Sequence, residues 1–200
     1  MKRTLKKYDD FDVVRVFLAV GEAGLVKRMD VCYRTLIGEG SIKSILSDLE
    51  AKELVEIDKK GNKLTASGED EFRKIKRLLS DIRPIRTDLF NDHFRAHGAV
   101  LKSYDSDKTN HIFQPRDHAI RLGCWSAMVL LYNKGTFQIP TLGIQEFGDL
   151  KDEIGLEDGD LVIAVSSRNR RDSEKGILSV AQYLNSDLDD MFSKISGRML

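Results

Sequence analysis

The segment spanning residues 38–68, GEGSIKSILSDLEAKELVEIDKKGNKLTASG, most constrains the fold of this chain. Its first part predicts an amphipathic helix, because apolar residues recur at helical spacing at Ile42, Ile45, Leu46 and Leu49. Two short strand-like runs follow, residues 54–58 and 63–65, around the turn KKGN. Gly61 and Asn62 in this turn tolerate positive φ. The segment therefore predicts a helix followed by a β-hairpin with a basic tip.

Two further helices are expected before this segment. Residues 9–24 begin with acidic side chains, which favour a helix N-terminus, and place Phe11, Val14, Phe17 and Leu18 at intervals of three and four. Residues 25–38 predict a shorter helix, and Gly38 both ends it and caps the next one. The side chains expected in the core from this second helix are Met29, Cys32 and Leu36.

A fourth helix is expected after the hairpin. Residues 67–82 place acids before bases, as the helix dipole prefers, and Pro84 opposes any continuation. The apolar face of this helix is expected to consist of Phe72, Ile75, Leu78, Leu79 and Ile82. We therefore expect residues 1–82 to form one domain, followed by a connecting segment at residues 83–96.

This order of elements resembles the winged helix-turn-helix of prokaryotic transcription regulators. The features that carry the resemblance are the helix exit L-x-x-L-x-x-K-x-L-V, the hairpin as wing, and the LT-x-x-G run that opens the last helix. The resemblance implies that the third helix lies in the DNA major groove and that the wing contacts the backbone or the minor groove. The DNA-contacting residues that it implies are Ser41, Lys43, Ser44, Ser47, Lys59, Lys60, Asn62 and Lys63.

Charge and symmetry bear on this prediction. Net charge is zero, but residues 1–86 hold 19 Lys and Arg against 15 Asp and Glu, giving +4, while residues 87–200 hold 13 against 17, giving −4. This asymmetry is consistent with a nucleic-acid contact confined to the first half. The third helix carries no arginine, so we expect contacts that position the duplex to outnumber those that read bases. Regulators of this type are commonly dimers, and we expect a homodimer on duplex DNA.

The second half predicts a mixed α/β domain at residues 97–200. The expected strands are 97–104, 125–132, 136–140 and 159–167, and the expected helices are 114–123, 147–155 and 172–188. Residues 116–140 and 156–167 resemble the carboxy-terminal part of uncharacterised archaeal winged-helix proteins. The fold class expected for the whole chain is thus α+β, with an N-terminal winged helix-turn-helix before the mixed domain.

The stretch AVSSRNRRDSEKG, residues 164–176, is the candidate ligand site of this domain. A strand leads here into serines, arginines and a helix N-terminus, a combination that can hold a carboxylate or phosphate. The residues proposed to bind a small anionic effector are Ser166, Ser167, Arg168, Arg170 and Arg171. The alternative is a solvated loop in which Asp172 and Glu174 neutralise the arginines.

Catalytic and metal-site patterns are missing from the sequence. It contains no G-x-S-x-G, Walker, dinucleotide, H-E-x-x-H or C-x-x-C motif, so neither an enzyme nor a bound cofactor or metal is expected. The histidines complete no familiar ligand spacing, although two of them would share a face if their segment were helical; they are His93, His97, His111 and His118. Cys32 and Cys124 are expected to be reduced and separately buried.

A cytoplasmic protein without a membrane span is expected, because the apolar run at residues 13–20 is short and interrupted by Arg15. The predicted function is a one-component transcription regulator. Its first half would bind duplex DNA, and its second half would bind a small, anionic ligand or a second subunit. Two alternatives stay open: a winged-helix module that docks a protein without binding DNA, and an enzyme with an unrecognised pocket in the second half.

Overall fold

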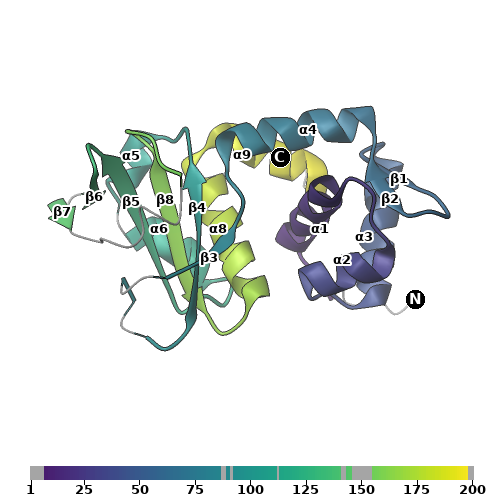
Figure 1. Ribbon diagram of the computed structural model, residues 1–200, viewed down its shortest axis with the longest axis horizontal. Coiled ribbons are helices and arrows are strands. Elements are labelled where there is room, and N and C mark those ends of the chain that lie inside the picture. The colour runs from purple at the N-terminus through teal and green to yellow at the C-terminus, as the bar shows by residue number, and fades with distance from the viewer. Residues whose placement is uncertain are drawn as a thin grey trace. The chain divides into compact units, whose positions relative to one another are not determined.

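The computed structural model describes residues 7–86, 89–90, 92–111, 113–140, 143–145 and 155–197, which form a helical N-terminal region and a C-terminal sheet (Figure 1). This mixture of helices and strands confirms the expected α+β class. The chain divides into two compact units, one of residues 1–75 and 190–200 and the other of residues 76–189. The C-terminal residues thus belong to the first unit, which the sequence pattern did not predict.

The first unit follows the predicted order of elements. They are α1 (Asp10–Ala23), α2 (Arg28–Thr35), α3 (Glu39–Ala51), β1 (Val55–Ile57), β2 (Asn62–Leu64) and α4 (Ala66–Leu78). The side chains predicted for the core from α3, namely Ile42, Ile45, Leu46 and Leu49, are all 2% exposed or less. Helical spacing of apolar residues was therefore a sufficient signal for this helix.

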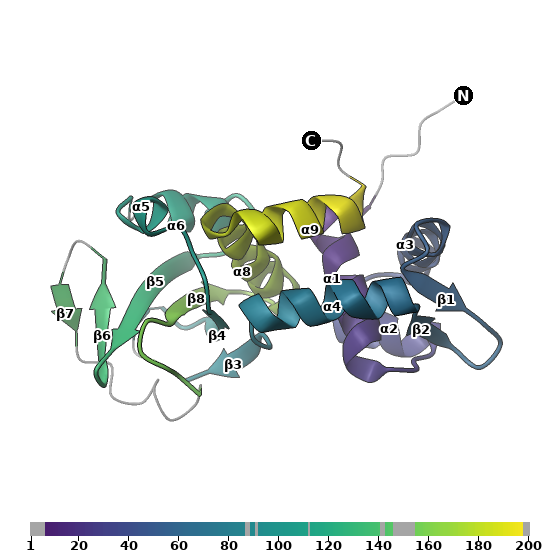
Figure 2. The ribbon, with the colours of Figure 1, turned by 90° about the horizontal axis from the view of Figure 1, so that it is seen from above.

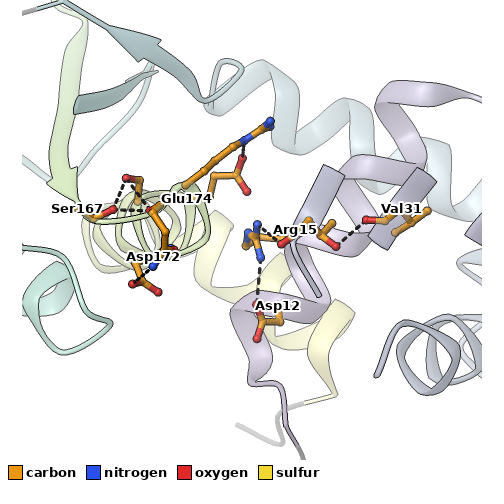
Figure 3. A network of polar contacts seen from close by, with 10 residues as sticks. Asp12, Arg15, Val31, Ser167, Asp172 and Glu174 are labelled. Carbon is orange, nitrogen blue, oxygen red and sulfur yellow. Dashed lines mark hydrogen bonds and ion pairs between the residues drawn. The ribbon is translucent and has the colours of Figure 1, made fainter. Parts of the chain in front are cut away.

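A buried ion pair within α1 is linked by a hydrogen bond to the end of α2. Asp9 caps α1, since its carboxylate accepts the N–H of Asp12 at 3.0 Å. The Asp12 carboxylate also accepts a hydrogen bond from Arg15 at 3.1 Å, and Arg15 donates to the backbone oxygen of Thr35 at 2.8 Å (Figure 3). Both charged side chains are almost fully buried, and removing either would leave the other charge without its ion-pair partner.

The predicted core of α2 is wrong. Met29 and Leu36 are 47% and 53% exposed, and Cys32 is half-buried, whereas Val31 is fully buried and Ile37 is 4% exposed. The reason is that Leu36 adopts a left-handed conformation, φ 58°, which ends the helix and sends the next side chain into the core. A helix of eight residues also offers too few turns for its apolar residues to determine which face is buried.

The hairpin forms as predicted, but one of its turn residues does not behave as expected. Strands β1 and β2 pair antiparallel, with Val55 opposite Leu64. Gly61 has φ 153°, and a side chain there would approach the Val26 carbonyl oxygen to 2.8 Å. Asn62 lies in β2 rather than in a positive-φ turn position, and its backbone exchanges hydrogen bonds with Val26.

The fourth helix is shorter than predicted. It ends at Leu78, and Lys102 donates its backbone N–H to the Leu78 oxygen at 2.8 Å. The chain then forms strand β3 (Arg83–Ile85), which pairs antiparallel with β4 (Arg95–Leu101). The predicted connecting segment, 83–96, is therefore partly sheet. Pro84 suits this place because β3 is an edge strand, where a missing N–H is tolerated.

The second unit is built on an antiparallel sheet with the strand order β3-β4-β8-β5-β6-β7. Its other strands are β5 (Ser126–Asn133), β6 (Thr136–Ile139), β7 (Gly143–Gln145) and β8 (Leu161–Ser167), and its helices include α5 (Ser106–Thr109), α6 (Phe113–Ile120) and α8 (Arg170–Leu184). Every residue of β8 is buried, as expected for a central strand covered on both faces. Helices α6 and α8 cover one face (Figure 2).

The opposite face of this sheet carries an apolar cluster. Its buried members are Ile85, Phe90, Val100, Leu130, Tyr132, Phe137, Ile139, Val162 and Ala164.

The predicted strands and the helix at 114–123 are confirmed within a few residues, and most of the predicted helix at 147–155 lies outside the described residues. The predicted helix at 172–188 is two helices, because α8 ends at Leu184 and α9 (Ser186–Ser196) follows.

The last turns of α9 are tied to the first unit. Lys194 donates to the Glu71 carboxylate at 2.6 Å, and Lys74 donates to the same carboxylate at 3.2 Å. Burial alone would raise the pKa of Glu71, but these two hydrogen bonds outweigh burial and lower the pKa below its usual value. Lys52 also donates to the Ile195 backbone oxygen at 2.6 Å.

No helix among the described residues is long and apolar enough to span a membrane.

Candidate functional site

A groove of about 500 Å³ lies between α2, α3 and the β1–β2 hairpin in the first unit. We call it the basic groove, because five basic side chains line it against two acidic ones. The basic residues are Lys27, Arg28, Lys43, Lys59 and Lys60, and the acidic residues are Glu50 and Asp58. All seven side chains are exposed, so the groove offers its charges to solvent.

Helix α3 contributes one side of the basic groove. Lys43 and Ser47 are four residues apart, share a face and line the groove. Ser41 and Ser44 lie outside it, and Ser44 donates its hydroxyl to the Gly40 carbonyl oxygen at 3.2 Å. The structure therefore divides the four residues predicted on this helix between the groove and the adjoining surface.

The hairpin contributes the other side. The Asp58 carboxylate accepts the backbone N–H of Lys60, and the backbones of Asp58 and Gly61 exchange hydrogen bonds of 3.0 and 3.3 Å. This closed turn displays Lys59 and Lys60 at the tip. Lys63, also predicted to contact DNA, lies outside the groove and pairs across the strands with Glu56 at 3.1 Å.

Asn62 is the predicted DNA contact that the structure does not support. Its side chain is 4% exposed, and its amide donates to the Val26 backbone oxygen at 2.9 Å. This buried hydrogen bond holds the hairpin against the segment between α1 and α2. We therefore correct the prediction: Asn62 lines the groove, but it is almost fully buried and its amide is already hydrogen-bonded within the fold.

Most of the positive charge in the basic groove is not neutralised. Within the described part of the chain, Lys27, Lys43, Lys59 and Lys60 form no ion pair, and only Arg28 has an acidic partner, Glu39 at 2.7 Å. That pair is exposed and therefore weak. In addition, Gly38 caps α3 without a side-chain hydrogen bond, and the Ser41 N–H of the first turn bonds to the Gly38 carbonyl oxygen at 3.0 Å.

Lys27 and Arg28 were missed by the sequence analysis. They lie at the N-terminus of α2, and only the packing of α2 against α3 brings them beside Lys43. Two adjacent bases before a helix are a common arrangement, so no local signal distinguished them. The groove thus contains basic residues from three elements that are separated in sequence.

The predicted anion site at the β8–α8 junction has a different character. Ser166 is fully buried and donates to the Asp92 carboxylate at 2.6 Å. Ser167 donates to the Asn169 backbone oxygen at 2.5 Å and shares a 2.7 Å hydrogen bond with the hydroxyl of Ser173 (Figure 3). Both hydroxyls therefore hold the fold together, and we remove Ser166 and Ser167 from the candidate ligand residues.

The arginines of this junction do not form one cluster around a bound anion. Arg170 pairs with Glu174 at 2.5 Å, and the Arg168 guanidinium lies 5.9 Å from the ring centre of Phe94. The N-terminus of α8 is already capped, because the Asn169 side chain accepts the N–H of Asp172 at 2.9 Å. Arg171 also has an interaction within the protein. The geometry supports the alternative of a charge-balanced junction.

The thiols and histidines show no constellation that would support catalysis. Cys124 is buried and donates to the Asp172 backbone oxygen at 3.2 Å, and burial raises the pKa of its thiol to about 12. Burial also lowers the pKa of His97, which lies in β4, so His93 and His97 do not share a helical face. The described residues contain no group of three or more His, Cys, Asp or Glu that could hold a metal ion.

Comparison with known proteins finds similarity to a domain and to a protein of unknown role. Residues 94–184 match a family described as a domain of unknown function, DUF4443. The fold is similar to that of hypothetical protein PH0730 from Pyrococcus horikoshii OT3, with a TM-score of 0.71 and 22% identity over 94% of this chain and 100% of that one. No curated protein matches. The findings fit the expected resemblance to uncharacterised archaeal proteins.

Proposed function

We propose that this protein is a transcription regulator whose first unit is a winged helix-turn-helix that binds duplex DNA. The observation that carries the proposal is the basic groove, in which unpaired lysines from α2, α3 and the hairpin surround an exposed helix face. The order of the helices and the hairpin agrees with such a module, in which α3 would be the recognition helix and the hairpin the wing.

The dimensions and side chains of α3 suit a major groove. A B-DNA major groove is about 12 Å wide and admits an α-helix, and small exposed side chains let the helix backbone come close to the duplex. Gly40, Ser44 and Ser47 meet that condition, and Lys43 lies among them. In this arrangement the N-terminus of α3, which has no side-chain cap, would favour a phosphate.

The remaining bases of the groove would contact the DNA backbone. Lys59 and Lys60 at the hairpin tip and Lys27 at the start of α2 are long, flexible and unpaired among the described residues. Lysine acts on phosphates as a point charge and carries little base specificity. We therefore expect affinity that depends strongly on salt and weakly on sequence.

The second unit would supply regulation. A ligand that binds two arrangements of the protein with different affinities shifts the balance between them, and this is how a sensor domain would alter DNA binding. The predicted homodimer is part of the same proposal. The predicted anionic ligand is retained, but its site is moved away from the β8–α8 junction.

Duplex-DNA affinity measured against salt tests the proposal, using the intact protein and a Lys43→Ala, Lys59→Ala, Lys60→Ala variant. A matched control replaces three exposed bases of the second unit, Arg83, Arg121 and Lys134, by alanine. We expect the groove variant to bind at least tenfold more weakly. Its slope of log K against log salt should be shallower by about 2 to 3, since each phosphate contact contributes about 0.9.

Two results would contradict DNA binding through this groove. One is the absence of binding to any duplex at low salt, and the other is an equal change of slope in the groove variant and the control. Both variants lose the same charge, so a difference between them reports position rather than net charge.

A second candidate function, protein docking, is favoured by one observation. Four large apolar side chains at helical spacing are exposed on and beside α2, namely Leu25, Met29, Tyr33 and Leu36, and Tyr33 is 74% exposed. Such a face is typical of an interaction surface. Docking through it would hardly depend on salt and would be lost in a Met29→Ser, Tyr33→Ser variant, which should retain DNA binding.

A further inference from the structure

The second unit contains a cleft of about 220 Å³ between α6, β5 and the end of β6. We call it the α6–β5 cleft. Its walls are mainly apolar: Phe113 and Pro115 come from α6, Met128 and Val129 from β5, and Ile139 from β6. The cleft is smaller than the roughly 300–1,000 Å³ typical of sites for drug-sized ligands, so it suits a small metabolite.

Three polar side chains border these apolar walls. Thr109 already donates its hydroxyl to the Ser106 backbone oxygen at 2.7 Å. Arg116 and Ser126, in contrast, form no hydrogen bond or ion pair within the described residues. Arg116 is also the one charged side chain lining the cleft as described.

The charge of Arg116 is not balanced by its own helix. Asp117 is the next residue, but adjacent positions on a helix point in different directions, so it does not face the cleft beside Arg116. This distinguishes Arg116 from Arg170 at the β8–α8 junction, which is paired with Glu174. An unpaired guanidinium at the edge of an apolar cleft is the arrangement that recognises an anion with an apolar body.

The exposure of Phe113 points in the same direction. Its side chain is 70% exposed although it lines the cleft, so its ring is in contact with water in the absence of an occupant. A ligand with an apolar body would cover part of this ring. A sugar or a nucleotide would instead place many of its polar groups against the side chains of Pro115 and Val129, which cannot form hydrogen bonds with them.

We propose that the α6–β5 cleft binds a small monocarboxylate with an apolar body. The guanidinium of Arg116 holds the carboxylate, and the apolar body lies beside Phe113, Pro115 and Val129, with Met128 and Ile139 at the border of the cleft. Regulation of DNA binding by such a ligand rests on the proposed function of the first unit. Binding of the carboxylate in the cleft is independent of that proposed function.

The direct test uses the intact protein with ¹³C-labelled Met and Ile methyl groups and two probes, hexanoate and phenylacetate. Hexanamide, which matches hexanoate in shape but carries no charge, serves as the control ligand. We expect hexanoate to shift the methyl resonances of Met128 and Ile139 to saturation. Hexanamide should bind at least tenfold more weakly, because it lacks the charge that Arg116 recognises.

Two variants test whether Arg116 supplies the positive charge that binds the carboxylate. Arg116→Gln should lower the affinity for hexanoate at least tenfold, to the level of hexanamide, without changing the affinity for hexanamide. Arg121→Gln removes an equal charge from an exposed residue just after α6 that does not line the cleft, and it should behave as the unmodified protein. Both substitutions are at exposed positions, so both proteins should fold.

The proposal is overturned if neither acid shifts these methyl resonances at 20 mM, a concentration that would nearly saturate a site with a dissociation constant of about 1 mM. It is also overturned if acid and amide bind equally, or if Arg116→Gln and Arg121→Gln have the same effect. DNA affinity measured with and without hexanoate separates the two proposals. If the protein binds hexanoate but no DNA, only the proposal of a transcription regulator is rejected. If it binds DNA but no hexanoate, only the proposal of a carboxylate site in the cleft is rejected.

Discussion

Serine and basic side chains occur together twice in this protein, once around the basic groove and once at the β8–α8 junction, and the two places differ in what they leave exposed. In the groove, Lys43, Lys59 and Lys60 are exposed and unpaired among the described residues. At the junction, Ser166 and Ser167 are buried and hydrogen-bonded within the fold. The same residue types thus support opposite conclusions.

The two helices that begin at these places show the same difference. Helix α8 has its first turn capped by the Asn169 side chain, whereas α3 begins at Gly38 without such a cap. An uncapped helix N-terminus can offer its N–H groups to a phosphate, whereas in α8 the Asn169 side chain already accepts the Asp172 N–H. A polar residue type therefore indicates a binding site only where the fold leaves its hydrogen-bonding groups unused.

The largest expected difference between the two units concerns their thiols. Burial raises the pKa of Cys124 to about 12, so at pH 8 only about one thiol in ten thousand is ionised. Cys32 in the first unit is half-buried, and burial also raises the pKa of its thiol. We expect Ellman's reagent to modify Cys32 at least a hundredfold faster than Cys124. A Cys32→Ala variant isolates Cys124, and equal rates would contradict the enclosure of that thiol.

Replacing one serine in each place should affect stability differently. Ser167→Ala removes a buried hydroxyl and leaves the Ser173 hydroxyl with one partner fewer, so we expect a loss of about 1–3 kcal/mol in the free energy of unfolding. Ser47→Ala, on the exposed face of α3, should be neutral or slightly stabilising, within about 0.5 kcal/mol. Urea denaturation measures both, and equal destabilisation would break the comparison.

The smallest expected differences concern the helix caps. Asn169→Ala should lower the free energy of unfolding by about 1 kcal/mol, because α8 loses its cap. Gly38→Ser should raise it by a few tenths of a kcal/mol, since a side chain at Gly38 meets nothing within 4 Å and can cap α3. Thermal denaturation of both variants tests this, and a destabilised Gly38→Ser protein would show that the start of α3 is not open.

The sequence pattern predicted the long helices well and the short one poorly. In α3, four apolar residues over more than two turns determine one buried face, and all four are buried. In α2, the expected core residue Leu36 is exposed because its left-handed conformation ends the helix, and Met29 is exposed as well. Backbone conformation at a single residue is a weak signal in a sequence, so this error could not be avoided.

Contacts between distant segments account for the other differences. Strand β3 forms because β4 offers it an edge to pair with. This partner is distant in the sequence, and the residues around Pro84 by themselves indicated only a turn. Lys27 and Arg28 join the basic groove through the packing of α2 on α3. The α6–β5 cleft likewise combines residues from three elements and has no motif of its own.

The sequence by itself therefore determined the order of most elements, the buried face of α3 and the basic character of the hairpin tip, because these follow from spacing between near neighbours. Only the tertiary structure decided that Asn62, Ser166 and Ser167 are internal and that the lysines of the groove are not. The physical reason is that burial and hydrogen-bond partners are set by residues far away in the chain.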